Sequence, residues 1–152
     1  MKVYRLSTET FIPASLDTVW NYFATPINLN EMTPPDMSFE ILTNVEGVKM
    51  YPGMIIQYKV RPLLNIPMGW TTEITHCEDG KYFVDEQRFG PYALWHHQHH
   101  FEAVAGGVKM TDTIHYAIGM GILGRIAYVA YVKNRLEGIF SFREKRVKEI
   151  FG

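Results

Sequence analysis

The stretch with the clearest chemical potential is the run HHQHH at positions 96–100, which stands between Trp95 and Phe101. In an extended strand successive side chains point to opposite faces, so His97 and His99 share one face with the two aromatic residues. We expect that face to point inward, because large aromatic side chains are mostly buried. The other two histidines of the run then point to solvent, and His97 and His99 become candidates for acid–base chemistry.

Asp85 stands on the preceding predicted strand and supplies a first carboxylate partner. If Gly90-Pro91 forms the hairpin turn, Asp85 falls opposite or diagonal to His97 on the same face. The same alignment brings two further inward residues close to the histidine strand, placing Phe83 near His99 and Gln87 near Trp95.

Asp112 supplies a second carboxylate from the following strand. If Gly106-Gly107 forms that turn, Phe101 faces Asp112, and His99 faces Ile114. His99 and Asp112 are then diagonal neighbours, still within reach of each other. One face of the sheet would hold two carboxylate–imidazole pairs. The apolar groups expected around these pairs are Trp95, Phe101, Ile114 and Tyr116.

Three interpretations of these four polar residues remain open. They form a satisfied hydrogen-bonded network in a core or pocket wall, which can also orient a ligand. Alternatively, an aspartate-oriented histidine acts as a general acid or base in a cyclisation, dehydration or hydrolysis, with Asp85, His97, His99 and Asp112 as the candidate catalytic residues. In the third interpretation the two histidines bind a metal, but a catalytic zinc usually takes three protein ligands and the spacing shows no third one. We therefore expect no metal and no cofactor.

Other chemistry has little support in the sequence. Cys77 is the single cysteine, which excludes a disulfide within the chain and favours a small core residue. The net charge of −1 and the lack of a basic stripe argue against a nucleic-acid partner. The late basic residues alternate with glutamates, as on a solvated helix face, and they are Arg143, Lys145, Arg146 and Lys148.

Neither a signal peptide nor an apolar run long enough to span a bilayer is evident, so we expect no transmembrane segment and a cytoplasmic location. The oligomeric state is not indicated.

The elements that position these residues are mostly strands. Residues 3–12 alternate as a first strand, which Pro13 ends. Ser15 is a good N-cap for a helix that Pro26 stops, and one more short helical turn follows. Further strands are predicted at 39–43, 54–61, 70–77, 82–88, 92–104 and 108–118, with a loop at 62–69 because of its two prolines.

A long helix of nearly 30 residues is predicted after Gly121, where the apolar period changes from two to about 3.6. Its apolar face is expected to comprise Ile122, Ile126, Val129, Leu136, Ile139, Phe140, Val147 and Ile150. The order of elements has no βαβ alternation and predicts an α+β fold. In it, a curved seven-stranded antiparallel sheet wraps around the long C-terminal helix, and two short helices follow the first strand.

Three blocks of residues resemble a known family. The stretch Phe11-Ile-Pro-Ala-Ser-Leu-Asp-Thr-Val-Trp resembles the opening of the START/SRPBCC superfamily, the helix-grip fold of birch-pollen-allergen-like proteins, lipid-transfer START domains and polyketide cyclases. The blocks Phe83-Val-Asp-Glu-Gln with Gly90-Pro-Tyr-x-x-Trp95-x-His97-x-His99-x-Phe101, and Gly106-Gly-x-x-Met110-x-Asp112-x-Ile114-x-Tyr116 with Gly121-x-Leu123-Gly124, are similar to its polyketide cyclase/dehydrase-like, ligand-binding branch. The resemblance covers the whole chain and implies a single domain over residues 1–152. It carries over no set of catalytic residues.

The favoured function is binding or carriage of a small hydrophobic molecule, such as a lipid, isoprenoid or polyketide-like compound, between sheet and helix. The alternatives are a cyclase, dehydratase or hydrolytic enzyme that uses an aspartate-oriented histidine, and a regulatory interaction module. The residues predicted to line the cavity are Tyr58, Trp70, Asp85, Gln87, Trp95, His97, His99, Phe101, Asp112, Tyr116, Leu136 and Phe140, with Ile56, Val60, Thr72, Ile74, Val129 and Lys133 as further candidates.

Overall fold

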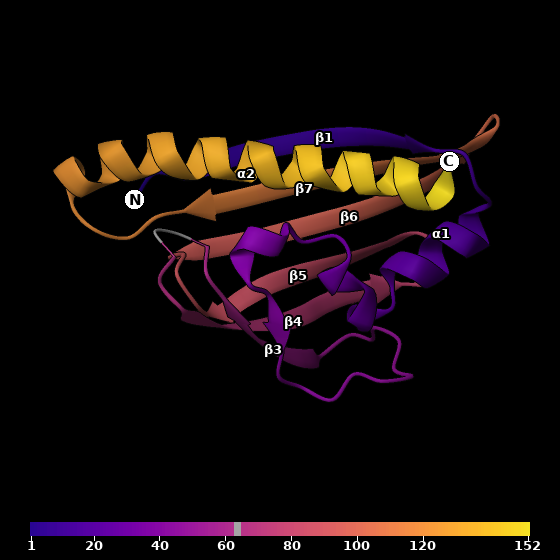
Figure 1. The fold of residues 1–152 in the computed structure, drawn as a ribbon, viewed down its shortest axis with the longest axis horizontal. Coiled ribbons are helices and arrows are strands. Elements are labelled where there is room, and N and C mark those ends of the chain that lie inside the picture. Colours follow the sequence, from indigo (N-terminus) through magenta and orange to yellow (C-terminus); the bar gives the residue numbers. More distant parts are fainter. Residues whose placement is uncertain (63–64) are drawn as a thin grey trace.

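The computed structural model describes residues 1–62 and 65–152, and within these ranges seven strands form one antiparallel sheet (Figure 1). The strand order is β1-β7-β6-β5-β4-β3-β2, a meander from β2 to β7 with β1 beside β7. The predicted antiparallel sheet is thereby confirmed. The strands are β1 (Tyr4–Ile12), β2 (Glu40–Ile41), β3 (Met54–Val60), β4 (Met68–Glu78), β5 (Tyr82–Phe89), β6 (Leu94–Val104) and β7 (Gly107–Ala117).

Two strand boundaries differ from the prediction. β2 has only two residues, because Glu40 and Ile41 alone pair with β3. β4 begins at Met68, inside the segment 62–69 that was expected to be a loop, since Met68 pairs with Val60. Pro67 directly precedes the strand, where its missing N–H costs no ladder bond. Positions 63 and 64 of the predicted loop lie outside the described residues.

Helix α1 (Leu16–Phe23) forms as predicted. Ser15 caps it, since its Oγ accepts a hydrogen bond from the Thr18 backbone N–H at 3.2 Å. The helix buries one side against the end of the sheet, where Trp20 packs edge-on against Phe101. Two 3₁₀ helices follow, η1 (Pro26–Asn30) and η2 (Pro35–Met37), of which only the first was predicted.

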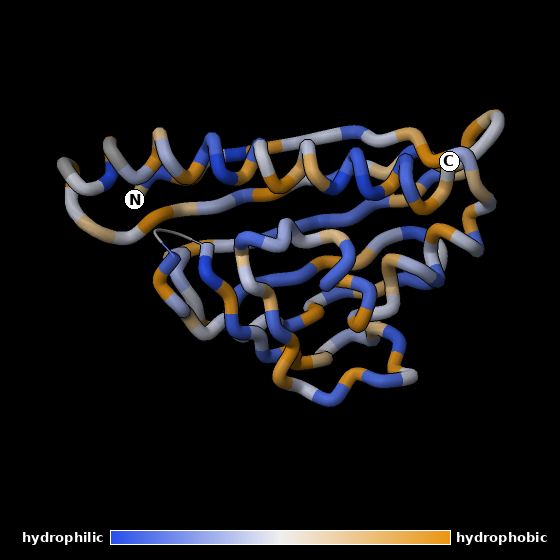
Figure 2. The backbone as a smooth tube through the Cα atoms, viewed as in Figure 1, coloured by the Kyte–Doolittle hydropathy of each residue, from blue (hydrophilic) through white to orange (hydrophobic). Residues whose placement is uncertain are grey.

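Helix α2 (Ile122–Phe151) has 30 residues and runs beside β1 and β7 along most of the sheet (Figure 1). Among the described side chains of α2, Val132, Leu136 and Val147 are buried, and hydrophobic and hydrophilic positions alternate along the helix (Figure 2). The predicted apolar face is wrong at its start, because Ile122 and Ile126 are 71% and 67% exposed. The first turns of α2 extend past the end of β7 (Figure 1), so the sheet does not cover them.

The β6–β7 turn consists of Ala105 and Gly106, one residue earlier than predicted. Gly106 has a φ of +81°, which favours glycine, whereas Gly107 already belongs to β7. A Cβ on Gly107 would lie 2.2 Å from the carbonyl oxygen of Ile12, so this glycine serves a close approach between strands. Moving the turn by one residue shifts the register by two.

Because of this shift, the predicted residue pairs between β6 and β7 are wrong. Each side chain nevertheless stays on its predicted face of the sheet, because side-chain direction repeats every two residues. Phe101 pairs with Met110 and not with Asp112, and His97 rather than His99 pairs with Ile114. His99 therefore faces Asp112 directly.

The sheet is bent where β4 and β5 pair, since their register shifts between Thr71 and Thr72 and again between Ile74 and His76. Such irregularities increase local twist and curve a sheet. Buried side chains fill two regions, one under α1 around Trp20 and one under α2 around Leu136. In the described parts of the chain, neither helix combines the length and apolar character that crossing a membrane requires.

Candidate ligand-binding cavity and its histidine–aspartate wall

A cavity of about 160 Å³ lies between the sheet, α2 and the segment that contains η1 and η2. Its lining is mostly aliphatic and aromatic. Eight of the twelve side chains predicted to line it do so, namely Tyr58, Trp70, Asp85, Trp95, His97, His99, Leu136 and Phe140. Val60, Thr72 and Ile74 from the further candidates also contribute, whereas Ile56, Val129 and Lys133 are absent from the lining.

The remaining four predicted residues lie away from the cavity lining. The Gln87 amide donates to the Tyr92 carbonyl oxygen and accepts from the Tyr92 N–H, at 2.7 and 3.1 Å, so it holds the β5–β6 turn. Phe101 packs under α1, and Tyr116 packs against Tyr4 with ring centroids 5.6 Å apart. Asp112 lies behind the two histidines.

Several lining residues were not predicted. Met32, Met37 and Met50 come from irregular segments or a 3₁₀ helix, where no periodic signal marks the inner side. Arg143 was assigned to a solvated face, yet its side chain is only 11% exposed. It lies seven residues after Leu136 and three after Phe140, so its helical spacing from the apolar face could have revealed it.

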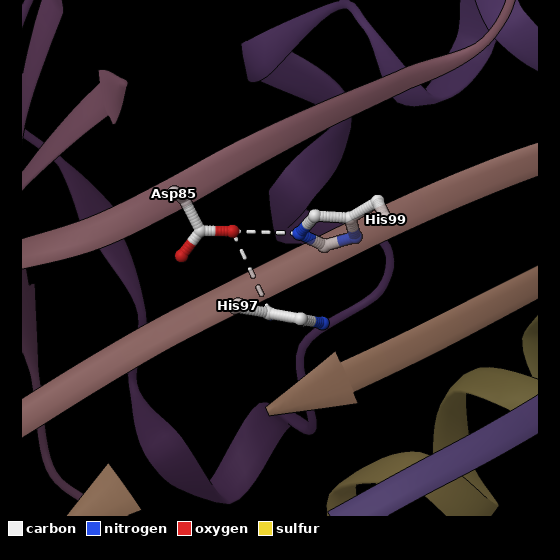
Figure 3. A group of neighbouring side chains, drawn as sticks. All are labelled: Asp85, His97 and His99. Carbon is white, nitrogen blue, oxygen red and sulfur yellow. Dashed lines mark hydrogen bonds and ion pairs between the residues drawn. The ribbon is translucent and has the colours of Figure 1, made fainter. Parts of the chain in front are cut away.

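The three central strands, β5, β6 and β7, bring four polar side chains together. We call them the polar wall, and they are Asp85, His97, His99 and Asp112. Asp85 of β5 faces His97 of β6 directly, as predicted, and Phe83 stacks on His99 with centroids 4.1 Å apart. The two imidazole rings lie 3.7 Å apart between centroids, and Asp85 points at both from the neighbouring strand (Figure 3). The His99 Nε2–H donates to Asp85 Oδ2 at 2.6 Å, and His97 Nδ1 lies 3.5 Å from the same oxygen.

Asp112 approaches the same rings from the other side. The His97 Nε2–H donates to Asp112 Oδ1 at 2.9 Å. His99 Nδ1 lies 3.0 Å from that oxygen without hydrogen-bond alignment. Both predicted carboxylate–imidazole pairs are present, but each carboxylate contacts both rings.

The wall continues beyond the four residues at both ends. The Trp95 Nε1–H donates to Asp85 Oδ1 at 3.3 Å. Arg143 Nη1 lies 3.7 Å from Asp112 Oδ1, and the Arg143 Nε–H has no hydrogen-bond partner among the described residues. A continuous series of polar contacts therefore crosses the sheet from β5 to α2. It runs from Trp95 through Asp85, the two histidines and Asp112 to Arg143.

The pKa values of the two histidines shift in opposite directions. Burial lowers the pKa of His97, the charge of His99 lowers it further, and the two carboxylates offset this only in part. Burial also acts to lower the pKa of His99, but hydrogen bonds and charges from Asp112 and Asp85 outweigh burial and raise it. Of the two rings, His99 is therefore the one whose protonated form the wall stabilises, and His97 the one whose neutral form it stabilises.

Both carboxylates stay ionised. Burial would raise the pKa of Asp112, but Arg143 and the histidines hold it well below its usual value. For Asp85 burial is likewise outweighed by His97 and His99, and the pKa is lowered. With His99 protonated, two carboxylates balance one imidazolium and one guanidinium, which allows this wall to be buried.

The outer face of β6 differs from its inner face. His100 is exposed, and His96 is half-buried with Nδ1 3.2 Å from Glu86 Oε1.

Cys77 is partly buried beside the core under α1, and burial raises the pKa of its thiol. Within residues 1–62 and 65–152, one group of three or more potential metal ligands gathers, namely Asp85, His97 and His99.

Comparisons with known proteins rest on structure. No protein-family model matches the sequence, and no curated protein matches it. The fold is similar to that of the Zhui aromatase/cyclase from Streptomyces sp. R1128, with a TM-score of 0.73 and 12% identity over 96% of this chain and 92% of that one. Protein Ms6760 from Mycobacterium smegmatis gives a TM-score of 0.70 and 15% identity over 100% and 96% of the two chains.

Ginseng major latex-like protein 151 from Panax ginseng gives a TM-score of 0.67 and 13% identity over 99% of this chain and 98% of that one. These similarities extend over nearly the full length of each pair, and they agree with the order of elements found here. The chain has the predicted α+β helix-grip fold, a seven-stranded antiparallel sheet with a long C-terminal helix, which these proteins share.

Proposed function

We propose that this protein binds a small, largely apolar molecule in the cavity between the sheet and α2, with a polar group of the ligand directed at the His97–His99 wall. The observation that carries the proposal is the combination of a mostly apolar lining with one concentrated polar wall. Concave apolar cavities with a few convergent polar groups are the usual form of small-molecule sites. An aromatase/cyclase with a similar fold supports this at the level of ligand class.

The volume limits the ligand. A cavity of about 160 Å³ is close to the roughly 150 Å³ that accommodates one benzene molecule in an engineered protein core, and below the roughly 300 Å³ of typical drug-sized sites. A compound with one or two rings therefore fits best. A longer lipid or isoprenoid requires the wall to adjust, and Met32, Met37 and Met50 are the flexible lining residues for that adjustment.

The polar groups suggest what the ligand carries. The Nε–H groups of Arg135 and Arg143 are buried without a hydrogen-bond partner in the described parts of the chain, and both side chains line the cavity. Buried donors are normally satisfied, so a ligand oxygen from a carbonyl, phenol or carboxylate would complete them. We infer that the ligand carries such an oxygen at one end and apolar rings at the other.

A second candidate function is acid–base catalysis on the bound molecule. It is favoured by one observation, that His97 and His99 line the cavity while each contacts two carboxylates. A carboxylate-oriented imidazole can move a proton during cyclisation or dehydration. If this holds, His97→Gln lowers kcat for a bound compound by far more than it weakens binding, which steady-state kinetics beside a binding titration would measure.

The binding proposal is tested with a panel of one- and two-ring aromatic acids, phenols and ketones, screened by thermal shift and confirmed by native mass spectrometry. A binding compound should lose affinity in Ile139→Trp, because Ile139 lines the cavity and a larger side chain would occupy it. Lys133→Trp on the exposed side of α2 is the matched control and should retain binding. Equal affinity in both variants would place the compound outside the cavity and contradict the proposal.

A further inference from the structure

We propose that Asp85, His97 and His99 bind a divalent first-row transition metal ion such as Zn²⁺, and that Asp112 orients both imidazoles from behind. The sequence alone predicted no metal, because spacing showed two histidines and no third ligand. The register of β5 against β6 supplies that ligand, since Asp85 stands directly opposite His97. This inference goes beyond ligand binding and does not depend on it.

The three side chains converge on one point. Their ligand atoms lie within 4.8 Å of one another, and Asp85 Oδ2 is 3.5 Å from His97 Nδ1 and 2.6 Å from His99 Nε2. Bonds of 2.0–2.1 Å around a tetrahedral zinc separate neighbouring ligand atoms by roughly 3.4 Å. The His97 distance already fits, and the His99 distance must lengthen by less than about 1 Å. Asp85 is the most exposed of the three, at 18%, so its carboxylate has room to rotate.

The nitrogens that face away from this point both lie beside Asp112. His97 Nε2 and His99 Nδ1 lie 2.9 and 3.0 Å from Asp112 Oδ1. Imidazoles that bind metals almost always direct their other nitrogen to a carboxylate, carbonyl or water, which sets the tautomer and the ring orientation. Here the buried Asp112 accepts a hydrogen bond from His97 and lies beside His99 Nδ1, which must turn into alignment for the same bond, so His97 Nδ1 and His99 Nε2 remain on the metal side.

The proposed ligands face the cavity, and the orienting carboxylate does not. Asp85, His97 and His99 belong to the cavity lining, whereas Asp112 lies behind it. A metal held by two histidines and one carboxylate keeps positions open for water or substrate. Those positions would open toward the apolar cavity, next to the space for an organic ligand.

The charges of the wall accommodate a cation. With both imidazoles neutral, Asp85 and Asp112 carry two negative charges, against the one positive charge of Arg143. A bound divalent ion changes this net charge from −1 to +1, which a bound hydroxide or ligand anion neutralises.

The test uses the full chain without an affinity tag, stripped with a chelator and dialysed. Zn²⁺ is titrated against a chromophoric chelator, and Co²⁺ is used as a spectroscopic probe. We expect one equivalent of Zn²⁺ per chain and an intense visible Co²⁺ band, which four- or five-coordinate sites give and hexahydrated surface ions do not. Sub-stoichiometric uptake, or a faint octahedral Co²⁺ spectrum, overturns the proposal without need of any variant.

Variants then locate the ion. His97→Gln, His99→Gln and Asp85→Asn should each lower Zn²⁺ affinity at least tenfold, and Asp112→Asn should lower it roughly 10–100-fold. The same strand offers a matched control, because His96 and His100 lie on its outer face and are changed together to glutamine. Far-UV circular dichroism selects the variants that remain folded. Affinity that falls in the outer-face variant, or that persists in the folded inner-face variants, excludes this site.

Discussion

Asp112 lies directly opposite His99 in the β6–β7 register, yet the ring that hydrogen-bonds to it is that of His97, through a contact of 2.9 Å. His99 instead donates to Asp85 on the other neighbouring strand, at 2.6 Å. The polar wall is therefore interlocked across β5, β6 and β7, so no member can be removed without leaving a charged or polar neighbour unpaired.

Removal of Asp112 should be strongly destabilising. Its side chain is 3% exposed and contacts Arg143 and both imidazoles, so Asp112→Ala leaves buried cationic and polar groups uncompensated. Breaking a buried pair in this way typically costs about 3–5 kcal/mol, which urea unfolding would measure. Glu102→Ala is the control, because Glu102 forms an exposed ion pair with Lys109 on the same two strands, and its removal should change the free energy of unfolding far less. Equal losses in the two variants would contradict the interlocked wall.

Alanine substitutions at two glycines should change the stability of the protein in opposite directions. Gly107→Ala places a Cβ 2.2 Å from the Ile12 carbonyl oxygen, so β1 and β7 must separate and the protein should lose stability. Gly138 lies inside α2 with open space around its Cβ position, so Gly138→Ala should stabilise by up to about 1 kcal/mol. Thermal and urea unfolding of both variants measure the difference. A stabilised Gly107→Ala protein would show that the close approach is not needed.

The Arg143 Nε–H, which has no hydrogen-bond partner among the described residues, should discriminate between ligands. If Arg143 binds a ligand oxygen, Arg143→Met should reduce affinity for an aromatic carboxylate about tenfold more than for its methyl ester, since a charge-assisted bond is lost only with the acid. Isothermal titration with this acid–ester pair provides the measurement. Lys145→Met, two residues along the helix and exposed, should leave the ratio unchanged. Equal losses for acid and ester would assign Arg143 a structural role only.

The ion pair between Arg135 and Asp36 at the cavity rim should break at acid pH. Arg135 Nη1 donates to Asp36 Oδ2 at 2.7 Å, and this hydrogen bond lowers the pKa of the Asp36 carboxyl below its usual value. The contact is therefore complete above the unfolded-state pKa near 3.8 and is lost as pH falls through the lower folded value. A carbon-13 NMR titration of Asp36 should give a midpoint below 3.8, which Arg135→Gln should move back toward 3.8. An unchanged midpoint in that variant would mean that Arg135 does not hold the carboxylate.

Much of the fold follows from local patterns in the sequence. Alternation along residues 94–104 determined that His97 and His99 face inward while His96 and His100 do not, because side chains on a strand repeat every two residues. Turn residues marked the hairpins, Ser15 marked the start of α1, and the change of period marked α2. Each of these signals acts over a few residues, so each is readable from the sequence.

The tertiary structure decided what depends on distant contacts. The segment Ala105-Gly106-Gly107 offers two positions for the β6–β7 turn, and the structure places it at Ala105 and Gly106, with Gly107 in β7 close to Ile12. This register determines which carboxylate faces which imidazole. Burial of Arg143 depends on how α2 lies on the sheet, and the lining methionines depend on how irregular segments fold over it. Periodicity determines which face a side chain takes, but only the packing of α1 and α2 decides which part of that face becomes core and which part becomes cavity.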